Sequence, residues 1–291
     1  MTDGGSELRD LVAGELSMPV DPRVADLAAA IAAKHGPASR AVLFYGSCLR
    51  EKRLDGLMLD FYLIVSDYRA AYAKRWLAVA NRLVPPNVFY FEHDGLAAKY
   101  AVLSEADFQR LNGPETSSVS VWARFAQPSR LVWAADEEAR SRAVDAVARA
   151  APTLLAAAGR IEGEPALDWW RRAFALTYSA ELRAERKGRA SSVVDVDPER
   201  YQRFSGPAMA AIPTKPPKQA GWAWRRVEGK FLSVARLAKA SFTFAGGADY
   251  IAWKINRHAG ANIELTPWQR RHPLLAGISL LPRLLRSGAV R

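Results

Sequence analysis

Cysteine, histidine and long apolar runs are scarce in this chain of 291 residues. Its single cysteine, Cys48, excludes an internal disulfide and is typical of a reducing compartment. No uninterrupted apolar run reaches the roughly 18 residues that a membrane-spanning helix needs. The opening MTDGGSELRD lacks the basic start and apolar core of a signal peptide. We therefore expect a cytoplasmic protein whose contact with a membrane is peripheral and at the inner face.

Several common catalytic signatures are missing as well. The chain has no Gly-rich loop ending in Lys-Ser or Lys-Thr, and no GxGxxG motif after a strand, which argues against the P-loop and dinucleotide-binding classes. The histidines lie too far apart in the sequence to show the spacing of metal ligands; they are His35, His93, His258 and His272.

Acidic residues are outnumbered by basic ones, 30 to 41, which gives a formal net charge of +11. This excess favours an anionic partner: a nucleotide, a nucleic acid or an acidic membrane surface. The alternative is a basic protein whose surface is merely soluble. Nucleic-acid binding is the least favoured partner, because the sequence shows neither a known binding module nor interleaved aromatic and basic residues.

The stretch from Ala41 to Asp67 carries the most chemical information. Two runs rich in Val, Ile, Leu, Phe and Tyr, residues 41–45 and 58–65, predict buried strands. Gly46-Ser47 follows the first run, and Asp60 lies within the second. A carboxylate in a half-buried strand needs a partner, and a metal ion is a common one. A small turn facing such an acid is how nucleotidyltransferase-fold enzymes bind a nucleoside triphosphate and its Mg²⁺.

The remaining pattern predicts an α/β protein in which a mixed-sheet domain is followed by helices. We expect a nucleotidyltransferase-like domain over residues 1–135, a mainly helical domain over 136–245, and a basic amphipathic C-terminal tail over 246–291. Further strands are predicted at 87–91, 99–103 and 131–133, helices at 24–35, 70–84, 136–158, 167–187, 224–240 and 248–258, and a Pro-rich linker at 207–221.

One position departs from the usual nucleotidyltransferase pattern. That pattern places two acids two residues apart on one strand, so that both can bind metal. Here position 62 is a tyrosine. Taken alone, this substitution favours an inactive site or a site for one metal ion.

Several segments in order resemble one family, the soluble phosphatidate cytidylyltransferases of the mitochondrial type, also called translocator assembly and maintenance proteins. That family makes CDP-diacylglycerol on a nucleotidyltransferase fold and lacks the second strand acid. The similar segments are Tyr45-Gly46-Ser47, Met58–Phe61, Val65-Ser66-Asp67, Lys99–Val102, Arg124 with Pro128, Leu176–Arg183, and Lys239 with Phe242, Thr243 and Gly246. Cys48 and Ser66 depart from the family, which favours a glycine and an acid there.

The resemblance implies CTP and phosphatidic acid as substrates, Mg²⁺ as cofactor and a bilayer surface as the place of reaction. It implies catalytic roles for Asp60, Asp67, Lys99 and Arg124, the two aspartates being the metal ligands. The implied nucleotide-binding residues are Tyr45, Gly46, Ser47, Tyr178, Ser179, Glu181 and Arg183, and the implied lipid-binding residues are Lys239, Arg283 and Arg286.

Several alternatives stay open at this point. The acceptor of the nucleotide could be a non-lipid molecule, or the chain could be a degenerate nucleotidyltransferase that binds a membrane without catalysis. The Leu- and Arg-rich tail over 273–291 fits a membrane contact and fits equally a helix that packs on the domain. The oligomeric state is undetermined, with a homo-oligomer among the alternatives.

Overall fold

The centre of the fold is a mixed five-stranded sheet, seen in a computed structural model that describes residues 3–49, 54, 56–181, 193–213, 220–243 and 264–271. The strands are β1 (Ser39–Tyr45), β2 (Met58–Val65), β3 (Asn87–His93), β4 (Leu96–Ser104) and β5 (Ser129–Ala134), in the spatial order β3-β4-β2-β1-β5. β2 and β4 are parallel and the other neighbours are antiparallel. The predicted α/β class with a mixed sheet is therefore confirmed.

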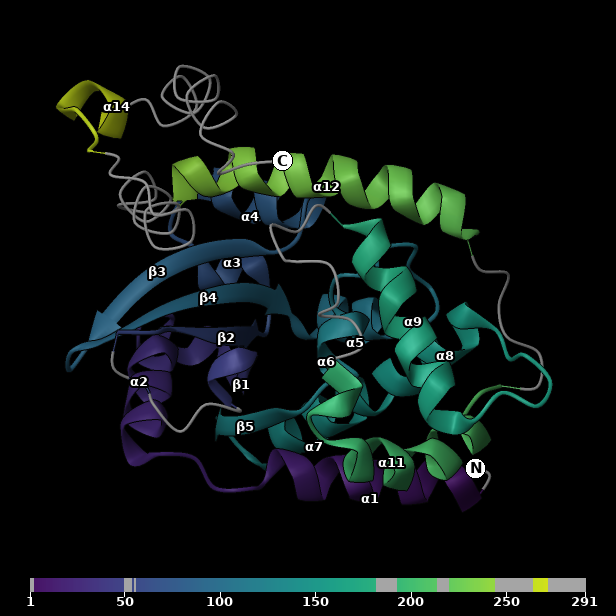
Figure 1. Cartoon of the computed structure of the whole chain (residues 1–291). Coiled ribbons are helices and arrows are strands. Elements are labelled where there is room, and N and C mark those ends of the chain that lie inside the picture. Colours follow the sequence, from purple (N-terminus) through teal and green to yellow (C-terminus); the bar gives the residue numbers. More distant parts are fainter. Residues whose placement is uncertain are drawn as a thin grey trace.

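Helices lie before, between and after the strands along the chain, and they cover the sheet (Figure 1). They are α1 (Asp3–Leu16), α2 (Pro22–Ala33), α3 (Tyr68–Ala71), α4 (Arg75–Leu83), α5 (Glu105–Asn112), α6 (Trp122–Phe125), α7 (Glu137–Ala148), α8 (Ala150–Ala158), α9 (Ala166–Ala180), α11 (Pro198–Ala210), α12 (Trp222–Thr243) and α14 (Pro267–Arg271), with short 3-10 turns η1 (Gly36–Ala38) and η2 (Ser47–Leu49).

The central strand β2 is buried on both of its faces, which is why its sequence reads as an almost continuous apolar run. Alternate side chains enter two different hydrophobic clusters. Phe61 and Leu63 pack with α2, whereas Tyr62 and Ile64 pack with the helices on the other face. Only Asp60 interrupts this run with a charge, near the start of the strand.

The larger cluster joins the first helix to residues about two hundred positions further along the chain. It includes Leu8 and Val12 of α1, Ile64 of the sheet, and Tyr201 and Phe204 of α11. The predicted boundary near residue 135 is thus not a packing boundary, because one continuous core spans both sides of it. α1 itself was not predicted, since residues 1–22 read as polar.

Three predicted elements differ in extent. The helix expected over 70–84 is two helices, α3 and α4, because the backbone is extended at Tyr72 after α3 and at Lys74 before α4. Asp67 caps the start of α3, its Oδ1 accepting a hydrogen bond from the backbone N–H of Arg69 at 2.7 Å. The helix over 136–158 is divided into α7 and α8. The linker expected from residue 207 begins later, because α11 continues through Pro207 to Ala210.

Two further expectations fall on the C-terminal part of the chain. The helix predicted at 248–258 and nearly all of the tail lie outside the described residues. Within the described ranges, none of the helices combines the length and the apolar character that crossing a bilayer would require.

Candidate nucleotide-transfer site

Asp60 and Lys99 form an ion pair across two neighbouring strands. They are opposite one another in the parallel ladder of β2 and β4. The Lys99 ammonium nitrogen lies 3.0 Å from Asp60 Oδ1, and the two side chains are 30% and 19% exposed. The sheet register therefore presents one carboxylate and one cation together at a partly open position.

The Gly46 turn lies directly against this carboxylate. β1 ends at Tyr45, which is opposite Asp60 in the antiparallel ladder, so the turn follows at the same end of the sheet. Gly46 has φ +95, and a Cβ added there would lie 3.0 Å from Asp60 Oδ2. Glycine supplies both the left-handed backbone and the room for this close approach. Ser47 then opens the turn η2.

Arg124, from α6, adds a second cation beside the pair. Its Nη1 lies 3.9 Å from Oε1 of Glu181, a side chain that is only 7% exposed and follows α9. Burial works against the charge of Arg124, yet Tyr62, Glu181, Tyr45 and Asp60 outweigh it and raise the pKa of this guanidinium. Arg124 is therefore a permanent cation held among aromatic and acidic neighbours.

Two tyrosines, Tyr45 and Tyr62, lie close to both Asp60 and Arg124. The rings of Tyr45 and Tyr62 are 5.2 Å apart. Burial, followed by the nearby charge of Asp60 and the other phenol, raises the pKa of Tyr45. Burial also raises the pKa of Tyr62, against the opposing effects of Arg124 and Arg236. Both phenols are neutral donors at neutral pH.

Sequence reasoning missed Arg236, which reaches this cluster from α12. Its Nε donates to the Pro85 carbonyl at 2.8 Å, and its charge acts on Tyr62, Glu181 and Arg124. Burial lowers the pKa of Arg236, and Glu181 opposes that effect. No local motif marks this arginine. The one signal is its position two turns after Gly229, on the same helix face.

Gly229 explains how α12 comes so close. A Cβ at this position would overlap the Ala180 carbonyl oxygen at the end of α9. Only a glycine permits this crossing of α12 and α9, which brings Arg236 near the residue that follows α9, Glu181.

The structure separates Asp67 from Asp60, which corrects the predicted metal pair. Asp60 lies near the start of β2, while Asp67 lies two residues past its end. Asp60 and Val65 alone are about 17 Å apart along the strand. Asp67 instead caps α3 and lies 3.8 Å from Arg82. A single metal ion cannot bind both carboxylates.

The other predicted site residues have mixed placements. Tyr178 is partly buried against the helical core, and Ser179 Oγ donates to the Leu176 carbonyl at 2.7 Å. The Lys239 ammonium donates to the carbonyls of Val84 and Pro86, so it is engaged within the fold rather than presented to a lipid. Arg183, Arg283 and Arg286 lie outside the described residues.

Asp60 is the residue that fits Mg²⁺ best. Its Oδ1 is buried and accepts no hydrogen bond, despite the nearby ammonium of Lys99. Among the described residues, no group of three His, Cys, Asp or Glu side chains could hold a metal ion. Mg²⁺ is often bound through one carboxylate together with substrate phosphates and water. The arrangement therefore fits an ion shared between Asp60 and a bound nucleotide.

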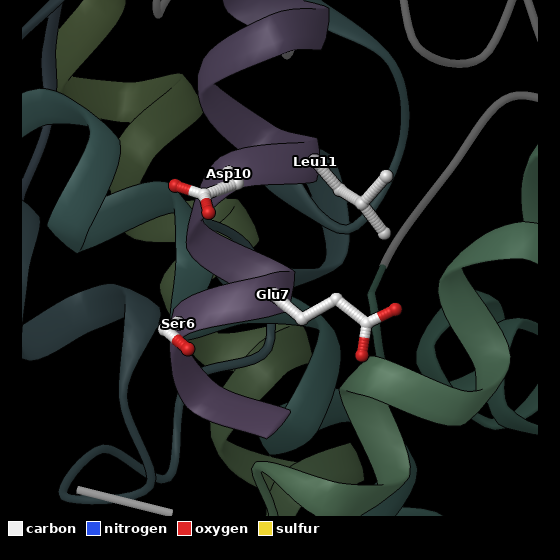
Figure 2. Close-up of a pocket in the computed structure, with 4 residues that line it drawn as sticks. All are labelled: Ser6, Glu7, Asp10 and Leu11. Carbon is white, nitrogen blue, oxygen red and sulfur yellow. The ribbon is translucent and has the colours of Figure 1, made fainter. Parts of the chain in front are cut away.

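A hollow of about 550 Å³ lies elsewhere, along α1 (Figure 2). Its lining residues are Ser6, Glu7, Asp10 and Leu11. Figure 2 shows Ser6 and Asp10 projecting to one side of the helix, and Glu7 and Leu11 to the other. The four side chains do not converge on a common point, so this surface has no geometry for catalysis.

In comparisons with known proteins, no protein-family model matches the chain, and no curated protein matches it. Among solved structures, the chain is similar to a nucleotidyltransferase-like protein from Exiguobacterium sibiricum, with 10% sequence identity and a TM-score of 0.29. The match covers 91% of this chain and 92% of that one.

Replacing Gly46 with alanine should impair the site more than the fold. The new Cβ would press on the Asp60 carboxylate, in addition to the strain of a left-handed backbone, about 1–2 kcal/mol. Gly36→Ala is the matched control, because Gly36 has φ +53 and open space around its Cβ position. We expect similar losses of unfolding free energy in urea titrations, but a loss of nucleotide binding by calorimetry in Gly46→Ala alone. Equal nucleotide affinities in the two variants would contradict the proposed contact.

Lys239 should make stability depend on pH. Burial, with a contribution from Arg236, lowers the pKa of Lys239 from 10.5 to about 7. Between these values the unfolded chain retains a proton that the folded chain has lost, so the free energy of unfolding rises with pH. From about pH 7 to pH 9 the parent should gain stability relative to a Lys239→Met variant, measured by urea unfolding. Parallel stability curves for the two proteins would exclude this titration.

Proposed function

We propose that the chain is a nucleotidyltransferase that transfers CMP from CTP to phosphatidic acid, giving CDP-diacylglycerol and pyrophosphate. The observation that carries the proposal is the close approach of the Gly46 turn to Asp60, with Lys99 3.0 Å from the same carboxylate. A turn, an acid and a cation in contact are the parts that hold a triphosphate and its metal ion. The resemblance of the ordered sequence segments supports the choice of CTP and phosphatidic acid.

The chemistry is an in-line displacement at phosphorus. A phosphate oxygen of the acceptor forms a bond to the α-phosphorus of CTP, the bond from that phosphorus to the bridging oxygen breaks, and pyrophosphate leaves with the electron pair. Mg²⁺, when bound, neutralises the charge of the phosphates. Asp60 would hold the metal ion and orient Lys99, and the Gly46-Ser47 turn would receive the triphosphate of CTP. Lys99 and Arg124 neutralise the charge that develops during transfer.

The charges of the site suit an acceptor that is itself a phosphate monoester. Three cations, Lys99, Arg124 and Arg236, surround two acids, Asp60 and Glu181. A phosphate monoester has its second pKa near 6, so at neutral pH it already carries a nucleophilic oxyanion. No side chain of the cluster then has to remove a proton. A hydroxyl acceptor would instead need a general base. Because phosphatidic acid is a bilayer lipid, the reaction would take place at a membrane surface.

A second candidate is a protein that binds nucleotide without transferring it. The position of Tyr62, where many nucleotidyltransferases carry a second acid, and the pairing of Asp60 with Lys99 favour it. A third reading, transfer to a phosphorylated acceptor other than a lipid, uses the same charges.

Turnover tests all three readings. Purified protein is incubated with labelled CTP and Mg²⁺, and with phosphatidic acid, diacylglycerol or glycerol 3-phosphate as acceptor, the lipids in mixed micelles. CDP-diacylglycerol from phosphatidic acid alone is the expected result. Product from glycerol 3-phosphate alone would replace the lipid with a water-soluble acceptor. CTP binding without any product would favour the second candidate, and no CTP binding would refute the nucleotide site.

A further inference from the structure

Large apolar side chains are exposed on two helices, α4 and α12. Leu83 is 73% exposed on α4, and Phe231 and Trp224 are 70% and 60% exposed on α12. The complete set, here called the α4/α12 surface, is Trp76, Val79, Leu83, Trp224, Val227, Phe231 and Val234. It holds seven of the eleven large hydrophobic residues that are exposed in the described part of the chain. A concentration of this kind marks an interaction surface rather than scattered exposure.

The exposed residues repeat at helical spacing. On α4 they are separated by three and then four positions, and on α12 by three, four and three. Each set therefore forms a stripe on one face of its helix. The opposite face of α12 is the one that packs, through Gly229 and Arg236, on α9 and the candidate site.

The two helices meet at the Pro85-Pro86 turn that follows α4. Arg236 donates to the Pro85 carbonyl, and Lys239 donates to the Pro86 carbonyl, each at 2.8 Å. Figure 1 shows α12 lying along one end of the molecule with α4 beside it, and α1 and α11 at the opposite end. Both stripes of exposed apolar residues therefore lie at the same end of the protein.

Cations border these stripes and outnumber the acids beside them, although the carboxylate of Asp67 lies 3.8 Å from Arg82. Lys74, Arg75 and Arg82 are exposed on or just before α4, and Arg226 and Lys230 on α12. α4 has no acidic residue, and the acid within Trp222–Thr243, Glu228, is half-buried with a buried Oε2. Apolar stripes that include tryptophan and are bordered by Lys and Arg suit the interface of an anionic bilayer.

We propose that the α4/α12 surface docks the protein on an anionic lipid bilayer. A second copy of the chain is disfavoured, because each copy would bring the same positive charges to the contact. The purpose of this docking rests on the proposed function. One face of α12 would touch the membrane, while the opposite face presents Arg236 to the site where the lipid acceptor would bind. It adds a membrane contact on α4 and α12 to the contact expected for the C-terminal tail, most of which lies outside the described residues.

Vesicle co-sedimentation of the full chain tests the proposal without CTP, Mg²⁺ or phosphatidic acid. Phosphatidylcholine vesicles are compared with vesicles that also contain phosphatidylserine, so the result is independent of turnover. The test variant is Trp224→Ser/Phe231→Ser. The matched control is Met18→Ser/Val196→Ser, which removes apolar side chains that are 52% and 58% exposed just after α1 and just before α11. Circular dichroism establishes that each variant is folded.

The parent should bind vesicles that contain phosphatidylserine, and salt should weaken this binding. The test variant should bind at least about tenfold more weakly, because two large apolar side chains no longer enter the lipid. The control should bind like the parent. Equal binding of parent and test variant, or equal binding to both kinds of vesicle, would overturn the proposal. A parent dimer in light scattering that the test variant dissociates would instead assign the surface to a second copy.

Discussion

Asp60→Asn is expected to reduce CMP transfer about 10³-fold, with little loss of folding stability. The variant keeps the shape of the side chain but removes the charge that lies 3.0 Å from Lys99 and against the Gly46 turn. Without that charge, the site would lose the carboxylate proposed to bind Mg²⁺ and the partner that orients Lys99. The measurement is the steady-state rate with CTP, Mg²⁺ and phosphatidic acid, together with CTP affinity by calorimetry.

Asp67→Asn is the matched control for this experiment. It makes the same chemical change just beyond the other end of β2. Asparagine also caps helices well, so α3 should remain intact. We expect a rate close to that of the parent. A loss as large as that of Asp60→Asn would restore Asp67 to the catalytic residues, whereas full activity of Asp60→Asn would remove Asp60 from them.

Glu15→Gln is expected to lower the free energy of unfolding by about 3–5 kcal/mol. Glu15 of α1 forms a bidentate pair with Arg200 of α11, and these side chains are 10% and 4% exposed. Burial disfavours the charge of Arg200, and Glu15 outweighs that effect, so the pKa of Arg200 is raised. The variant leaves a buried guanidinium without its counter-ion. Urea unfolding followed by circular dichroism measures the loss.

The exposed pair on the same helix gives the comparison. Arg9 of α1 lies 2.6 Å from Asp145 of α7, with side chains 37% and 47% exposed. Asp145→Asn should therefore cost only about 0.2–1 kcal/mol. Equal losses from the two variants would show that burial does not govern the strength of these pairs.

Residues with strong local patterns allowed much of the fold to be predicted. The apolar runs at 41–45 and 58–65 gave strands whose positions agree with β1 and β2, and the run at 131–133 lies in the edge strand β5. The approach of Gly46 to Asp60 agrees with the expectation of a small turn facing this acid, because β1 and β2 are antiparallel and Tyr45 at the end of β1 lies opposite Asp60 near the start of β2.

Other features depend on contacts between distant parts of the chain. The apolar positions of α1, Leu8, Val12 and Leu16, recur every four residues, a helical spacing that went unrecognised beside the polar residues of this segment, and they pack against α11 and α7. Arg236 enters the site only because Gly229 lets α12 cross α9 closely. The pairing of Asp67 with Asp60 was wrong, because a resemblance transfers residue types but not the distance along a strand.

The packing of α1 against α11 sets an order for folding during synthesis. Leu8 and Val12 are made nearly two hundred residues before Tyr201, Phe204 and Ala208, which enclose the same cluster. The nascent chain therefore leaves the ribosome with an unfinished core. Until about residue 210 has emerged, that apolar surface is open to chaperones and to neighbouring chains.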